Sequence, residues 1–92
     1  MEEKSQGVGP KKNGQWESFE HEGFTIEASA TSSPINLIVR VFLKGDHVLT
    51  GRFSETDGQL EYADHNRAPS YRTRKYIRDY AFHKINQLKE QT

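Results

Sequence analysis

Positive charge and tyrosine gather near the C-terminal end of this sequence. The segment PSYRTRKYIRDY carries four cations within its first three helical turns, and Arg67 precedes it. Cations of this kind neutralise phosphate groups, and neighbouring aromatic rings can stack on bases or on guanidinium groups. The pattern predicts a surface that contacts nucleic-acid phosphates, made of Arg67, Tyr71, Arg72, Arg74, Lys75, Tyr76 and Arg78.

The same cations have a second explanation inside the molecule. At the start of a helix the macrodipole already places partial positive charge, so each added cation is unfavourable by a few tenths of a kcal/mol. Either carboxylates of the same chain, such as Asp57, Glu61 or Asp64, pair with the cations, or an external anion does. Residues 1–63 hold six Lys or Arg against ten Asp or Glu, and residues 64–92 hold seven against three. The total of 13 basic and 13 acidic residues argues against a dedicated nucleic-acid protein, because such domains are usually basic.

Other chemistry finds little support in the residue types. The pairs Asp46-His47 and Asp64-His65 suggest metal ligands, but their spacing matches no ligand signature, and the chain has no cysteine. A Gly-x-Ser-x-Gly nucleophile motif and a cysteine nucleophile are also absent. We therefore expect no metal site, no cofactor, no small-molecule substrate and no enzymatic activity.

The cations must be positioned by a helix over residues 69–90. Apolar residues recur there at steps of three and four, which places them on one stripe that must be buried. Pro69 and Ser70 are typical of a helix start, since proline is tolerated in the first turn and serine caps free backbone amides. Phe82 is the one large apolar residue outside the stripe, which consists of Ile77, Tyr80, Ala81, Ile85 and Leu88.

A run of strands precedes the helix. Apolar and polar residues alternate with period two, and turn signals with Gly23, Gly45 and Gly58 separate the segments. The expected strands cover residues 16–19, 24–30, 35–43, 47–53 and 59–63. The sequence thus predicts an α+β fold: a single antiparallel meander sheet of four to five strands, followed by one C-terminal helix packed on one face.

One helix covers only one face of such a sheet. The other face should show side chains that are partly apolar, and exposed apolar patches often mark contact surfaces. Three explanations remain open: a protein partner or second copy binds there, the N-terminal hairpin around Trp16 and Phe19 covers it, or it is simply exposed. The candidate partner-binding residues on this face are Ile38, Arg40, Phe42, Val48 and Arg52.

The chain should form one domain, at residues 16–92, after a disordered arm at residues 1–15 that is rich in glycine and charge. No apolar run approaches the length of a membrane span, and the first residues lack the layout of a signal peptide. Together with the lack of cysteine, this predicts a cytoplasmic protein that does not enter a membrane.

Two functions follow from these patterns. The first is a non-enzymatic binding or regulatory domain that contacts nucleic-acid phosphates through the basic start of the helix. The alternative is a small protein-protein interaction module, an adaptor or inhibitor of a nucleic-acid-handling protein, that uses the open sheet face. The partners of the helix cations should distinguish the two, because cations already paired within the molecule need no external anion.

Overall fold

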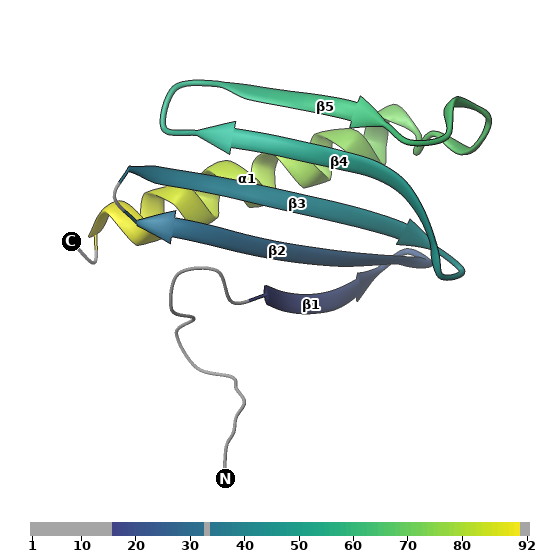
Figure 1. Cartoon of the computed structure of the whole chain (residues 1–92), viewed down its shortest axis with the longest axis horizontal. Helices are drawn as coiled ribbons and strands as arrows, with labels where there is room; N and C mark the ends of the chain where they lie inside the picture. Colours follow the sequence, from purple (N-terminus) through teal and green to yellow (C-terminus); the bar gives the residue numbers. More distant parts are fainter. Residues whose placement is uncertain (1–15, 33, 91–92) are drawn as a thin grey trace, which may run out of the picture.

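The protein is an antiparallel sheet backed by one helix (Figure 1). The computed structural model describes residues 16–32 and 34–90, so the predicted arm at residues 1–15 lies outside the described residues. The strands are β1 (Trp16–His21), β2 (Phe24–Ser32), β3 (Ile35–Leu43), β4 (Asp46–Ser54) and β5 (Gly58–Tyr62), followed by a short 3₁₀ helix η1 (His65–Arg67) and by α1 (Tyr71–Glu90). Each strand pairs with the next in the chain, in the order β1-β2-β3-β4-β5. The predicted α+β meander is confirmed, with five strands.

Two tight turns set the register of the sheet. Glu22 and Gly23 have φ angles of +50° and +89°, and Lys44 and Gly45 have φ angles of +52° and +87°. Positive φ at both central residues is typical of two-residue hairpin turns whose twist matches that of the strands. These turns pair the residues that flank them directly, which sets the register of β1 with β2 and of β3 with β4 at the turns.

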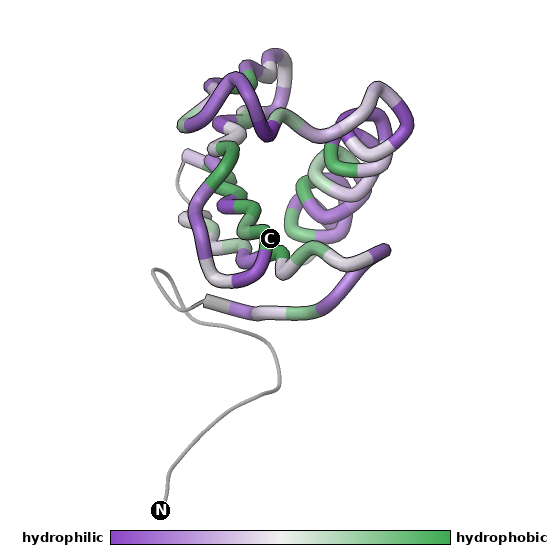
Figure 2. Tube along the Cα trace, turned by 90° about the vertical axis from the view of Figure 1, so that its right-hand side faces the viewer, coloured by the Kyte–Doolittle hydropathy of each residue, from purple (hydrophilic) through white to green (hydrophobic). Residues whose placement is uncertain are grey.

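The core lies between the sheet and α1, which packs mainly against the central strands β3 and β4. Figure 2 shows apolar stretches of the sheet and of the helix facing each other. The predicted helical stripe is buried at Ile77, Ala81 and Ile85, whereas Tyr80 and Leu88 are half-buried at its margins. Strand β3 alternates as expected, with four buried side chains: Ile35, Leu37, Val39 and Val41.

Phe82, which the helical stripe does not explain, belongs to a second set of contacts. Its ring packs edge-on against Phe53, with the ring centroids 5.5 Å apart. Phe53 in turn fills space above Gly51 and Gly58, where an added Cβ atom would come within 2.6 Å of the ring. The two glycines therefore make room for an aromatic pair that joins β4 to the outer flank of α1.

Strand β1 is held against the other flank of the helix by alternate side chains. Glu17 accepts a hydrogen bond from the Tyr80 hydroxyl at 2.9 Å and pairs with Lys84 at 2.7 Å. Phe19 contacts the Tyr80 ring, with the centroids 5.1 Å apart. Since Phe19 faces the helix, the idea that it covers the opposite sheet face is wrong. The side chain of Trp16 lies outside the described part of the structure.

A β-bulge in β4 corrects one predicted position. Val41 pairs with Leu49 and Phe42 pairs with His47, so Val48 is an extra residue between them. An extra residue shifts the alternation of side chains by one. The Val48 side chain is fully buried, and the prediction that it lies exposed on the uncovered face is therefore wrong. His47 takes that place beside Phe42, with the two ring centroids 5.5 Å apart.

Candidate binding surfaces

The start of α1 carries the predicted cations without a compensating acid. Ser70 is the N-cap, and its hydroxyl accepts a long hydrogen bond of 3.4 Å from the Thr73 amide. The first turn holds no acidic residue. Any carboxylate that pairs with these cations must therefore come from outside the first turn of α1.

Two of the four helix cations pair with carboxylates at the surface. Arg72 lies 3.1 Å from Glu22 of the β1–β2 turn, and Lys75 lies 2.8 Å from Asp79 one turn further along the helix. The hydrogen bond to Asp79 raises the pKa of Lys75. The Arg72 side chain remains 83% exposed, and such surface pairs contribute little to stability.

Arg67 has a structural role. Its guanidinium donates to the Asp46 carboxylate at 2.7 Å and to the Leu43 carbonyl oxygen at 3.2 Å. These contacts tie the loop before the helix to the β3–β4 turn. The cation is thus already engaged by the molecule itself.

Arg74 bonds to the sheet rather than to an acid. It donates to the Tyr62 hydroxyl at 2.6 Å, and its guanidinium carbon lies 5.9 Å from the centre of the Tyr71 ring. Its Nε is buried and has no hydrogen-bond partner within the described residues. Tyr71 is 70% exposed, so one face of this aromatic ring is open to solvent.

The two remaining residues of the predicted nucleic-acid surface, Arg78 and Tyr76, differ in whether the molecule itself engages them. Arg78 is exposed, and no carboxylate pairs with it within residues 16–32 and 34–90. Tyr76 is half-buried and stacks on His21, with the ring centroids 3.6 Å apart and the planes nearly parallel. A surface for an external anion at the helix start is thus reduced to Tyr71, Arg74 and Arg78.

The basic C-terminal half of the chain is largely neutralised by the acidic sheet. Four ion pairs in the described structure join the two parts, with distances of 2.7 to 3.6 Å: Arg67–Asp46, Arg72–Glu22, Lys84–Glu17 and Lys89–Glu55. The opposite charges of the two parts of the chain are therefore paired with each other in the folded molecule. None of these partners is among the carboxylates that the sequence suggested.

The uncovered side of the sheet is called the open face here and consists of Ile38, Arg40, Phe42, His47, Thr50 and Arg52. Ile38 is 36% exposed, Phe42 is half-buried, and the Arg40 guanidinium carbon lies 6.0 Å from the centre of the Phe42 ring. Side chains from the flanking strands pair with the two arginines: Glu27 with Arg40 at 2.8 Å and Glu61 with Arg52 at 3.4 Å. The open face therefore has apolar groups on the central strand β3 and paired charges around them.

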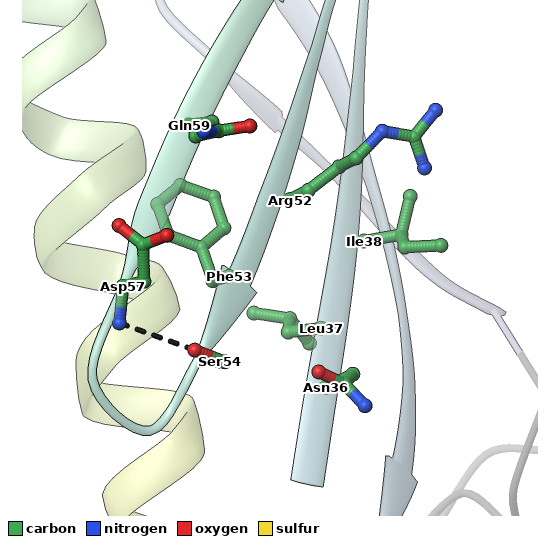
Figure 3. A pocket seen from close by; sticks show the side chains of 8 residues that line it. All are labelled: Asn36, Leu37, Ile38, Arg52, Phe53, Ser54, Asp57 and Gln59. Carbon is green, nitrogen blue, oxygen red and sulfur yellow. Dashed lines mark hydrogen bonds between the residues drawn. The ribbon is translucent and has the colours of Figure 1, made fainter.

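A shallow depression of about 340 Å³ adjoins Ile38 at the end of the sheet near the β4–β5 turn. Figure 3 shows Ile38 and Arg52 projecting away from the helix, while Phe53 lies on the side toward it. The depression is lined by Asn36, Leu37, Ile38, Arg52, Phe53, Ser54, Asp57 and Gln59. It offers an apolar floor beside one guanidinium and two amide groups.

The described residues contain no group of three His, Asp or Glu side chains that could together hold a metal ion. Asp46 is bound to Arg67, and the Asp64 carboxylate accepts a hydrogen bond from the Asn66 amide at 3.0 Å. Both acidic members of the Asp-His pairs therefore organise turns. No helix within residues 16–32 and 34–90 is long and apolar enough to cross a bilayer.

Comparison with known proteins adds no family: no family model, no curated protein and no solved structure matches this chain. The two candidate surfaces therefore have to be judged on their own geometry. They lie on opposite sides of the sheet, the cations with the helix and the open face away from it.

Sequence reasoning missed three groups that shape these surfaces. Glu22 reaches Arg72 from a distant turn, and nothing in the local pattern of either residue indicates the pairing. His47 enters the open face only because of the bulge. Gln59 lines the depression, and its outward position on the strand was the signal that could have identified it.

Proposed function

We propose that this protein is a non-enzymatic binding module that recognises another protein through its open face. The observation that carries the proposal is that Ile38 is exposed and Phe42 is only half-buried on the uncovered side of the central strand, on either side of Arg40. Protein interfaces are enriched in aromatic residues and arginine at their centre and have a polar rim. The open face has this arrangement, with Glu27 and Glu61 at the rim.

The depression beside Ile38 strengthens the proposal. The residues that dominate binding energy usually insert into well-packed pockets near the centre of an interface. An apolar side chain of a partner would rest against Ile38, and a polar group beside it would meet Arg52. The site would thereby select a partner by shape and charge together.

The test is a comparative affinity purification from the source cell with the wild-type chain and with Phe42→Glu. A charge at the centre of the interface should weaken partner binding at least about thirtyfold, as expected for an energetically dominant residue. The control is His83→Glu, which introduces the same charge at an exposed position on the outer side of α1. Isothermal titration with each recovered protein then measures the loss directly.

Three results bear on the proposal. Equal recovery of every protein with all three chains contradicts it. If the wild-type chain has the mass of a dimer in light scattering and Phe42→Glu has the mass of a monomer, with no foreign protein recovered, the partner is a second copy. If Phe42→Glu unfolds the domain by circular dichroism, Arg52→Glu replaces it, because that side chain is 56% exposed and lines the depression.

Nucleic-acid binding at the start of α1 is the second candidate. Exposed Tyr71 beside Arg74, and Arg78 without a carboxylate partner in the described structure, favour it. The four ion pairs that neutralise other cations weaken it. Affinity for an eight-residue oligothymidine should fall steeply with salt, and Arg78→Gln should reduce both the affinity and the salt slope. Salt-independent binding, or none, removes this candidate.

A further inference from the structure

We infer that the free edge of β5 binds an extended acidic segment of another protein, which joins the sheet as a sixth strand. This surface is distinct from the open face, and the inference does not rest on the function proposed for that face. It uses the backbone of β5 together with Arg78 and Arg74 of the adjacent helix.

The backbone of β5 offers unused hydrogen-bonding groups. Two bonds lie at the ends of its ladder with β4: the Ser54 amide donates to the Asp57 carbonyl at 2.8 Å, and the Ala63 amide donates to the Val48 carbonyl at 2.9 Å. In an antiparallel pair, alternate residues turn their amides and carbonyls toward the neighbouring strand. Between these ends, Gln59 and Glu61 therefore face β4, and Leu60 and Tyr62 face outward.

These outward groups lie at an outer edge of the sheet (Figure 1). Within the described residues, the amides of Leu60 and Tyr62 have no hydrogen-bond partner, whereas the Gly58 amide is bound by the Asp57 carboxylate at 2.8 Å. An exposed edge of this kind is a template for an added strand.

The flank of α1 supplies the selectivity. Arg74 bonds to Tyr62 at the end of β5, and the Phe82 ring lies 3.3 Å from where a Cβ atom of Gly58 would stand at its beginning. Residues four apart lie on the same side of a helix, so Arg78 stands between these two contacts and beside the middle of β5. An arginine without a carboxylate partner in the described structure thus borders the free backbone of Leu60.

This arrangement favours an acidic peptide over the alternatives. In an added strand, every second side chain points to the helix side, where carboxylates would meet Arg78 and Arg74. The backbone bonds would supply affinity and the carboxylates specificity. A nucleic acid would use the cations alone and would leave the strand amides unbonded.

The test uses the full isotope-labelled chain and two capped synthetic peptides, TVEVEVET and TVKVKVKT. The acidic peptide should shift the amide resonances of β5 and slow hydrogen exchange at Leu60 and Tyr62, and the basic peptide should bind at least about tenfold more weakly. Arg78→Gln should weaken binding of the acidic peptide about fivefold. The matched control Arg72→Gln, which removes a cation already paired with Glu22, should change it less than about twofold.

Other outcomes overturn the inference. The acidic peptide binding without slower exchange at Leu60 and Tyr62 would mean plain charge attraction. If oligothymidine binds more tightly than the acidic peptide, and Arg78→Gln weakens this binding as well, the site is assigned to nucleic acid. Slow exchange at these amides in the absence of peptide, growing with protein concentration, would assign the edge to a second copy. Because Phe42 is not involved, failure here leaves the open-face experiment unaffected.

Discussion

Among single residues, Val48 shows how one irregularity decides which side chains a surface presents. Strict alternation would put Val48 beside Phe42 and would give the open face three apolar groups. The bulge instead turns Val48 into the core and brings a histidine to the surface. The open face is accordingly more polar than alternation alone indicates, and its apolar part is confined to β3.

Because of the bulge, substitutions at the neighbouring residues Val48 and His47 should lower the free energy of unfolding by different amounts. Val48→Ala should lower the free energy of unfolding by about 2 kcal/mol, because it removes buried methyl groups and leaves a cavity. His47→Ala should lower it by less than about 1 kcal/mol, since the exposed ring loses one hydrogen bond to Thr50, of 2.7 Å. Urea denaturation of the two variants measures both values. Equal losses would contradict the burial of Val48.

Tyr80 links stability to alkaline pH. Burial, and then the hydrogen bond to Glu17, raise the pKa of this phenol above its ordinary value. The folded state therefore retains the proton where the unfolded chain loses it, and the stabilisation is complete below about pH 10 and is lost as the pH rises toward the folded value. The difference in unfolding free energy between wild type and Tyr80→Phe should thus shrink as the pH rises above about 10. Urea titrations at several pH values measure this difference. A difference that stays constant with pH would refute the linkage.

Among the elements, β1 is an edge strand that is also held by contacts outside its own ladder. It has six residues, pairs with one neighbour, and is fixed to α1 by Glu17, Phe19 and His21. Edge strands with few partners open at low free-energy cost. The bonds of Glu17 to Tyr80 and Lys84, together with the ring contacts of Phe19 and His21, therefore keep this edge closed.

Glu17→Gln should make β1 open more readily. Loss of the charged hydrogen bonds should cost about 1–2 kcal/mol, which hydrogen exchange of the β1 amides would report as faster opening. The matched control is Glu20→Gln on the same strand, whose side chain bonds to Thr25 on the other side of the sheet. Equal acceleration in both variants would show that Glu17 does not hold the strand.

For the whole molecule, periodic patterns carried most of the information about the fold. Alternation along β2 and β3, glycines at the turns and the stripe of Ile77, Ala81 and Ile85 correctly predicted a meander of four to five strands followed by one helix, and the structure has five strands. The candidate surfaces were less predictable, because they depend on which distant residues meet. Arg72 and Glu22 become neighbours only after folding, and the adjacent apolar residues Val48 and Leu49 do not by themselves reveal the bulge. Local sequence thus determined the scaffold, while long-range contacts determined which cations remain available.

The meander order also governs how the protein can form. Every strand pairs with its neighbour in the chain through a short connection, so little loop-closure entropy opposes each hairpin, and folding on the order of milliseconds is expected for such local topology. The helix that covers the apolar side of the sheet has 20 residues and follows all five strands in the chain. During translation the apolar face of the completed hairpins therefore stays exposed to water until α1 has left the ribosome and can pack on it.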